Sequence, residues 1–256
     1  MAETDKSGKG VDLLGIAEVG KALAPLSKAA LKVTESAIGG AEAFLGRICL
    51  PAAEEFGLLV RDRVSHWRAC NAAAIAEKAQ AKLEGRDTPG LHAHPRLVSE
   101  VIGKGSWTDD DALQDMWAGL LASSCTENAD DSNLIFTGLL GQLTSLQVIV
   151  LNLACTHSIK YTRRAGFAHA DPIRLTLQEL ESLTGVNDKF RLDRELDHLR
   201  SLNLTGRGFH CEKLVAEIGP SPLALAMYVR CQGFIGSPVE FWDLKPKGKQ
   251  AHGSPA

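Results

Sequence analysis

Residues 105–125 read GSWTDDDALQDMWAGLLASSC, and this stretch decides between a helical protein and a metal-dependent one. Three consecutive aspartates, followed by Asp115, suit either a metal or phosphoryl-transfer site or the start of a helix. Thr108 precedes them, and apolar residues with helical spacing follow, namely Leu113, Met116, Trp117, Leu120 and Leu121. A threonine N-cap with an acid three residues later resembles a capping box, and the helix dipole stabilises the other carboxylates. The stretch therefore predicts a helix capped by Thr108, with Trp117 in the core.

A metal site would need further ligands that converge on these aspartates. Asp130 and Asp131 are the nearest acids along the chain, and their loop lacks the Gly-centred pattern of a calcium site. The histidines and cysteines show neither the C-x-x-C nor the H-x3-H spacing of zinc sites. The phosphate-binding, nucleophile-elbow and zinc-protease motifs are also missing from the sequence. We predict no metal and no cofactor, and the sequence favours a protein that is not an enzyme.

The composition favours helices and an intracellular environment. The chain has 256 residues, of which 45% are hydrophobic and only 5% aromatic, and alanine and leucine are abundant. Its net charge of −3 provides no general attraction to nucleic acid or anionic lipid. The six cysteines form no C-x-x-C pair, the N-terminus has no signal-peptide pattern, and no apolar run approaches the length of a membrane span. These features predict a cytoplasmic protein with buried, reduced thiols.

The order of patterns predicts a mainly α fold, with an N-terminal helical domain followed by a small winged-helix-like α+β C-terminal domain. We expect a disordered tail at 1–10, the helical domain at 11–157, a linker at 158–172, the winged-helix-like domain at 173–242 and a disordered tail at 243–256. Within the helical domain, helices are expected at 51–85, 96–105, 109–124, 132–142 and 144–156. The amphipathic stretch 11–50 is expected to be a packing helix pair, and a membrane-surface element is the alternative.

The C-terminal domain is expected to contain a short helix at 175–185, a second helix at 189–204, a two-stranded wing at 205–219 and a closing helix from 220. In the second helix the residues expected to face inward are Phe190, Leu192, Leu196 and Leu199. Between Ile173 and Gln232 there are eight Lys/Arg and eight Asp/Glu, whereas a reader of duplex DNA gathers positive charge. Protein contact is therefore favoured over DNA, with Arg191, Arg194 and Arg207 as candidate interaction residues.

A catalytic alternative rests on Arg61 and His66, which have four residues between them and could share one helix face. Ribonucleases of the HEPN type use such a pair, with the histidine as acid or base and the arginine stabilising phosphate charge. The chain offers other pairs at similar spacing, such as Arg163/His169 and Arg191/His198. The pair is therefore a weak signal, and chance explains it better than catalysis does.

Four segments resemble the Abi-alpha (abortive infection alpha) family of bacterial phage-defence proteins: PAAEEFGLLVRDRVSHWR, HPRLVSEVIGKGSWTDDDALQDMWAGLLASS, DDSNLIFTGLLGQLTS and SPLALAMYVRCQGF. The resemblance implies a mostly helical protein that acts against phage, and it transfers no catalytic residues. Asp62 matches a position that the family keeps acidic, whereas His66 does not belong to the family pattern. Asp62 and Trp67, which lie in the first segment, join the candidate interaction residues.

These observations together predict an antiphage protein that acts through contacts with a phage or host protein, as a sensor, regulator or non-enzymatic effector. Assembly as a homo-oligomer is also expected. Three alternatives stay open: a HEPN-like ribonuclease toxin that uses Arg61 and His66, a membrane-acting effector that uses residues 11–50, and a winged-helix DNA-binding regulator.

Overall fold

A computed structural model of the chain describes residues 28–49, 63–86, 90–163, 165–210 and 213–244. The chain divides into two units, residues 1–36 and residues 37–256. Helix α2 (Lys28–Ile48) runs across this boundary, and every later element belongs to the second unit. Several predictions fall outside the described residues: the tail at 1–10, residues 11–27 of the membrane-surface alternative, the candidates Arg61 and Asp62, and residues 245–256 of the C-terminal tail.

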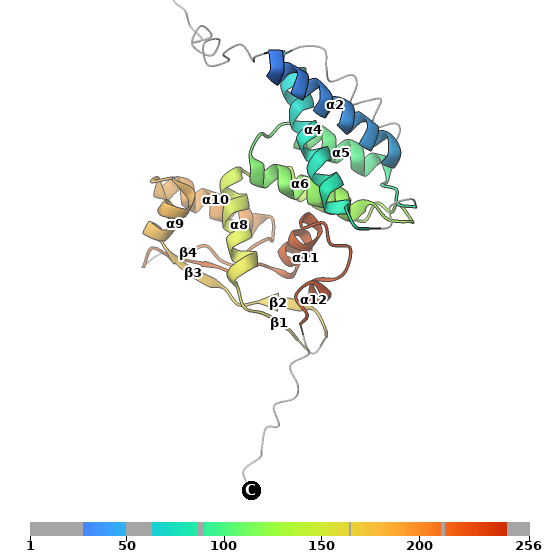
Figure 1. Ribbon diagram of the computed structural model, residues 1–256. Helices are drawn as coiled ribbons and strands as arrows, with labels where there is room; N and C mark the ends of the chain where they lie inside the picture. Colours follow the sequence, from blue (N-terminus) through green and yellow to red (C-terminus); the bar gives the residue numbers. More distant parts are fainter. Residues whose placement is uncertain (1–27, 50–62, 87–89, 164, 211–212, 245–256) are drawn as a thin grey trace, which may run out of the picture. The chain divides into compact units, whose positions relative to one another are not determined.

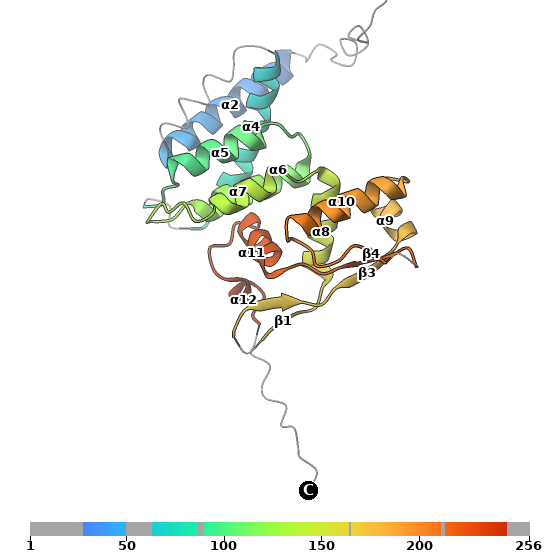
Figure 2. The ribbon, with the colours of Figure 1, turned by 180° about the vertical axis from the view of Figure 1, so that it is seen from behind.

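Helices α4 (Arg63–Leu83) and α6 (Asp111–Ser124) lie side by side in the helical part (Figures 1 and 2). Small side chains on the buried face of α4 allow this close contact, namely Ala69, Ala72, Ala73, Ala76 and Ala79. Trp117 of α6 is only 2% exposed, which confirms its predicted place in the core. Its indole lies against Gly105, where an added Cβ would be 3.1 Å from Trp117 Cγ.

Four further helices pack around α6: α5 (Pro95–Gly105), α7 (Leu134–Leu140), α8 (Ser145–His157) and α11 (Pro222–Cys231). Helix α8 begins with a capping box in which Thr144 and Gln147 exchange hydrogen bonds. Helix α11 comes closest to α6 at Gly119, where an added Cβ would lie 1.6 Å from the carbonyl oxygen of Cys231. The short helix α12 (Pro238–Phe241) follows α11.

The small C-terminal sheet contains β3 (Ile173–Thr176), β4 (Phe209–His210) and β5 (Val215–Ile218). Strand β5 lies between the other two and pairs antiparallel with both, with Ile218 opposite Ile173 and Ala216 opposite Phe209. Helices α9 (Leu177–Thr184) and α10 (Lys189–Ser201) separate β3 from β4 in the sequence. The predicted fold class, mainly α with a small α+β C-terminal part, is confirmed, while the domain boundaries stay a prediction.

The stretch expected to be a linker contains a β-hairpin of β1 (Lys160–Thr162) and β2 (Ala168–Ala170). Thr162 and Ala168 are directly opposite each other and both are buried, and β2 contacts α11. One face of the hairpin therefore packs on the protein, which explains why turn-rich sequence forms strands here.

Four of the five described cysteines are buried, namely Cys49, Cys125, Cys155 and Cys231, and all five are free thiols. Burial raises the pKa of the Cys125 thiol to about 11 and that of Cys155 to about 12. The prediction that the cysteines are buried is confirmed for these four residues. Within the described part of the chain, none of the helices combines the length and hydrophobicity that a bilayer crossing requires.

Candidate interaction surface

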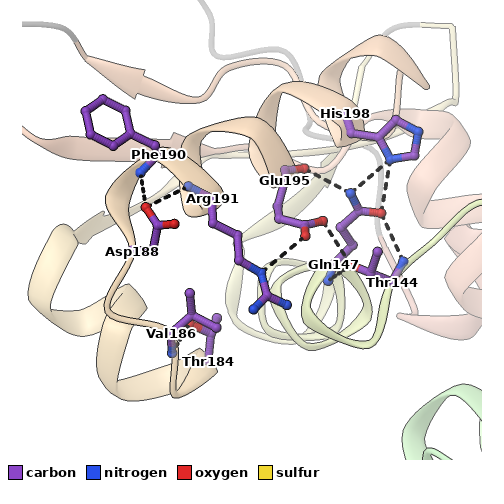
Figure 3. Close-up of polar contacts among 9 residues, drawn as sticks. All are labelled: Thr144, Gln147, Thr184, Val186, Asp188, Phe190, Arg191, Glu195 and His198. Carbon is purple, nitrogen blue, oxygen red and sulfur yellow. Dashed lines mark hydrogen bonds and ion pairs between the residues drawn. The ribbon is translucent and has the colours of Figure 1, made fainter. Parts of the chain in front are cut away.

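Helix α10 is fixed to α8 through a buried carboxylate, that of Glu195 (Figure 3). Glu195 is 9% exposed, and its Oε2 accepts a hydrogen bond of 3.0 Å from Thr144 Oγ1. Gln147 Nε2 donates to the Glu195 backbone oxygen at 3.2 Å, and the Gln147 amide also contacts His198 Nδ1. Because these groups satisfy one another, α10 is held in one rotation about its own axis.

The first turn of α10 is ordered by Asp188, its N-cap residue. The carboxylate accepts hydrogen bonds from the backbone N–H groups of Phe190 at 3.0 Å and Arg191 at 3.2 Å (Figure 3). In the turn before it, Gly185 has φ of 69°, and the Val186 N–H donates to Thr184 Oγ1. The positive φ explains the glycine, because an L side chain rarely adopts this conformation. The turn therefore positions the start of α10 through local contacts.

Phe190 lies on the solvent side of α10 and is 73% exposed, so the prediction that it faces inward is wrong. Leu192, Leu196 and Leu199 are buried as predicted. The physical reason is helical geometry. At about 100° per residue, residue 190 lies about 160° around the helix axis from residue 192. Because the contacts of Glu195 fix the rotation of α10 with Leu192 in the core, Phe190 faces solvent. Lys189 Nζ lies 5.1 Å from the centroid of the exposed ring.

Most cations on and near α10 are paired within the chain. Arg191 Nε lies 3.8 Å from the Glu195 carboxylate, and Arg207 donates to Glu217 at 2.8 Å. Arg174 also donates to Glu217, and the two arginines hold the pKa of this carboxyl below its usual range. Arg194, by contrast, is exposed and makes no ion pair with any described residue. The surface around Phe190 is therefore aromatic, with Lys189 over the ring and Arg194 as the two cations that make no ion pair with a described residue.

The acidic stretch begins a helix, but the cap is two residues later than predicted. Asp110 is the N-cap of α6, and its Oδ1 accepts from Leu113 N at 2.9 Å. Thr108 Oγ1 accepts from Asp110 N at 3.1 Å, so Thr108 supports the cap and is not the cap itself. Aspartate caps a helix as well as threonine does, and its charge interacts favourably with the helix dipole.

The later aspartates of this stretch join α6 to α4. Asp111 pairs with Lys78 at 2.5 Å and Asp115 pairs with Lys82 at 3.1 Å. The hydrogen bond from Lys78 holds the pKa of Asp111 below its usual range. Among the described residues, no three His, Cys, Asp or Glu side chains are placed to hold a metal ion together.

On α4 the structure describes His66 and Trp67, whereas their predicted companions Arg61 and Asp62 are outside the described residues. His66 Nε2 lies 3.7 Å from Cys70 Sγ, and burial raises the pKa of this thiol. A nucleophilic cysteine needs a lowered pKa, so the pair does not form an activated dyad. Trp67 is 38% exposed, and its interaction role stays a prediction.

An open cavity of about 580 Å³ lies away from α10, between α2, α4 and the segment around His92. Apolar Phe44 and Leu83 line it together with the cations Arg47 and Arg86. Arg86 is already bonded to the backbone carbonyls of Ala122 and Gly233. The described lining mixes apolar and charged groups without pointing to one class of ligand.

Glu195 is the residue of this surface that sequence reasoning missed. Its position on the helix was a usable signal, because it falls among Leu192, Leu196 and Leu199 on the apolar side. An acid at such a position needs a partner, since an unpaired buried carboxylate is costly. The partner itself, Thr144, lies 51 positions away and has no sequence signal of its own.

A family model described as "Abortive infection alpha" matches residues 68–214, which is more than half of the chain. The match includes α5 to α10 and the strands β3 and β4, and it ends just before β5. Searches of curated proteins and of solved structures found no match.

Proposed function

This chain belongs to the abortive infection alpha family, and from that premise we propose that it takes part in defence against phage through protein contacts. In this proposal it is a non-enzymatic sensor, regulator or effector in the cytoplasm, and its partner is a phage or host protein. The contact surface is the exposed side of α10 around Phe190 and Arg194.

The observation that carries this proposal is the 73% exposure of Phe190 on a helix that is otherwise firmly packed. Aromatic and arginine side chains are the usual anchors of protein interfaces, where they fill pockets on the partner. Phe190 and Arg194 are four residues apart on one helix, so they project from the same side. The buried Glu195 network supports the proposal because it keeps this side turned outward without the partner.

We also propose that α8, β3, α9, α10, β4 and β5 form a winged helix, in which α10 has the place of the recognition helix. The order of these elements and the strand order β3-β5-β4 support this assignment. Duplex DNA would require unpaired cations on α10 and the wing, because phosphate contacts supply most of the non-specific affinity. Ion pairing of Arg191 and Arg207 with glutamates favours a protein partner instead.

The double variant Phe190→Ser/Arg194→Glu is expected to reduce phage protection at least tenfold, because it removes the apolar anchor and reverses the unpaired charge. Its melting temperature should stay within about 2 °C of the parent protein, since both side chains are exposed. Plating efficiency on cells that express each variant measures the first effect, and thermal unfolding measures the second.

The matched control is Ile135→Ser, which removes an apolar side chain that is 57% exposed on α7. It should leave protection unchanged. Full protection by the double variant would rule out this side of α10 as the contact surface. Pull-down from infected cells, compared with sequencing of escape phage, then identifies the partner.

His66→Ala separates the ribonuclease alternative from protein contact. We expect full phage protection and intact cellular RNA profiles, because His66 lies on α4 and is not part of the α10 surface proposed to make the protein contact. Loss of protection by a folded His66→Ala variant would restore the ribonuclease alternative.

A further inference from the structure

The exposed side of α10 has charges of opposite sign on the two sides of Phe190. At about 100° per residue, Arg194 lies about 40° from Phe190 around the helix axis in one direction, and Asp193 lies about 60° from it in the other. Both are exposed, and neither makes an ion pair with any described residue. The ring of Phe190, directed away from Thr144 and Gln147 in Figure 3, therefore stands between an unpaired cation and an unpaired anion.

The other charged residues on this side of α10 are compensated or lie at its margins. Arg200 Nη2 lies 2.9 Å from a carboxylate oxygen of Asp197, so these two charges cancel each other two turns after Phe190. Lys189 and Arg191 lie about 100° to either side of Phe190, where water screens their charges. Within α10, which the structure describes throughout, the unpaired charges that face outward with the ring are therefore one arginine and one aspartate.

This arrangement is complementary to itself. A two-fold rotation about an axis parallel to α10 brings two copies of the helix side by side in the same direction, with the two Phe190 rings in contact. Each Arg194 then lies beside the second copy's Asp193, because the two residues are on opposite sides of the ring, as facing charges are in a parallel helix pair. A partner surface with a single sign of charge would instead place a like charge against either Arg194 or Asp193. The charges therefore favour a second copy.

We propose that a second copy of this chain binds here, in a two-fold dimer in which the α10 helices pack in parallel through Phe190, Asp193 and Arg194. Helix α10 has 13 residues and is about 20 Å long, so the contact is smaller than a stable interface requires, and the dimer is weak and reversible. The two buried rings provide most of the affinity. The exposed ion pairs contribute less, and they determine which way the two helices align.

The dimer covers the same side of α10 that the proposed function assigns to a phage or host protein, and its regulatory consequence rests on that proposed function. A partner can bind one copy only after the other copy has been released. The apparent affinity for the partner therefore falls as the concentration of the chain rises, because a smaller fraction of the chain is free to bind. Before infection, each exposed ring is covered by the other and is not offered to unrelated proteins.

The test is sedimentation velocity of the full chain over a series of concentrations, and we expect a monomer–dimer equilibrium in the micromolar range. Arg194→Asp and Asp193→Arg should each raise the dissociation constant of the dimer about tenfold, because like charges then face each other. An equimolar mixture of these two variants should dimerise as well as the parent chain, since every aspartate again meets an arginine. Phe190→Ser should raise the dissociation constant about a hundredfold, because two rings leave the interface.

The matched control is Ile135→Ser, which changes an exposed apolar residue of α7 and should leave the dimer unchanged. A parent chain that stays monomeric at the highest concentration would overturn the proposal. So would a mixture of the two charge variants that dimerises no better than either variant alone.

The dimer and the proposed function can fail separately. If the parent chain is monomeric and the Phe190→Ser/Arg194→Glu variant still loses phage protection, the dimer is excluded and the proposed function stands. If the parent chain dimerises as expected and that double variant protects fully, the proposed function fails and the dimer stands.

Discussion

Replacing Gly119 by alanine is expected to destabilise the protein by about 3 kcal/mol or more, because it places a methyl group inside the backbone of α11. The added Cβ would lie 1.6 Å from the Cys231 carbonyl oxygen and 2.3 Å from its carbon. Backbone atoms cannot move aside as a flexible side chain can, so α6 and α11 must separate. The gain of helix propensity from Gly to Ala, about 1 kcal/mol, offsets only part of this cost.

The matched control is Gly138→Ala in α7, where an added Cβ meets nothing within 4 Å. There only the gain in helix propensity remains, and the variant should be as stable as the parent or up to about 1 kcal/mol more stable. Urea unfolding of the three proteins measures both effects. If Gly119→Ala and Gly138→Ala unfold at the same urea concentration, the close contact between α6 and α11 does not exist.

Trp117→Ala is expected to destabilise the protein by about 3–5 kcal/mol, the range for removing a large aromatic side chain from a core. Trp117 is 2% exposed, and its ring lies close to Gly105 at the end of α5. Alanine would leave a cavity that the rigid backbone around Gly105 cannot close. Thermal and urea unfolding measure the loss of stability. If the alanine variant does not fold, Trp117→Phe is measured in its place, and we expect a smaller loss of stability for it.

Trp107→Ala is the natural comparison, because it makes the same change ten positions earlier at a residue that is 59% exposed. Its main described contact is with Arg68, whose guanidinium lies 4.3 Å from the ring centroid. An exposed cation–π contact contributes about 0.5–1 kcal/mol, so the loss should stay near that value. Equal losses in the two variants would contradict the core position of Trp117.

The helices and their ends could largely be predicted from the sequence, because they depend on residues within one or two turns of each other. The acidic stretch at Asp109–Asp111 was correctly assigned to a helix start, and only the choice between Thr108 and Asp110 as cap was wrong. Both residues are good caps, and the ion pairs of Asp111 and Asp115 with α4 depend on residues 33 positions away. The local sequence pattern around Thr108 contains no information on these distant ion pairs, so it could not take their contribution into account.

The candidate surface was only partly predictable. Arg191 and Arg194 were named from the sequence, but Phe190 was assigned to the core, because a phenylalanine beside leucines is usually buried. Its exposure follows from the rotation of α10, which the contacts of Glu195 with Thr144 and Gln147 determine. The β1–β2 hairpin was read as a turn-rich linker, because its strands are three residues long and too short to show alternation.

The sequence by itself determined the mainly α fold, the helix limits and the neutral charge of the C-terminal part, since periodicity, caps and composition are local or additive properties. The tertiary structure alone decided which side of α10 faces solvent and where α6 touches α11. Each of these depends on residues from 51 to more than 100 positions apart, and their contact is set by packing of the whole core rather than by any pattern within one segment.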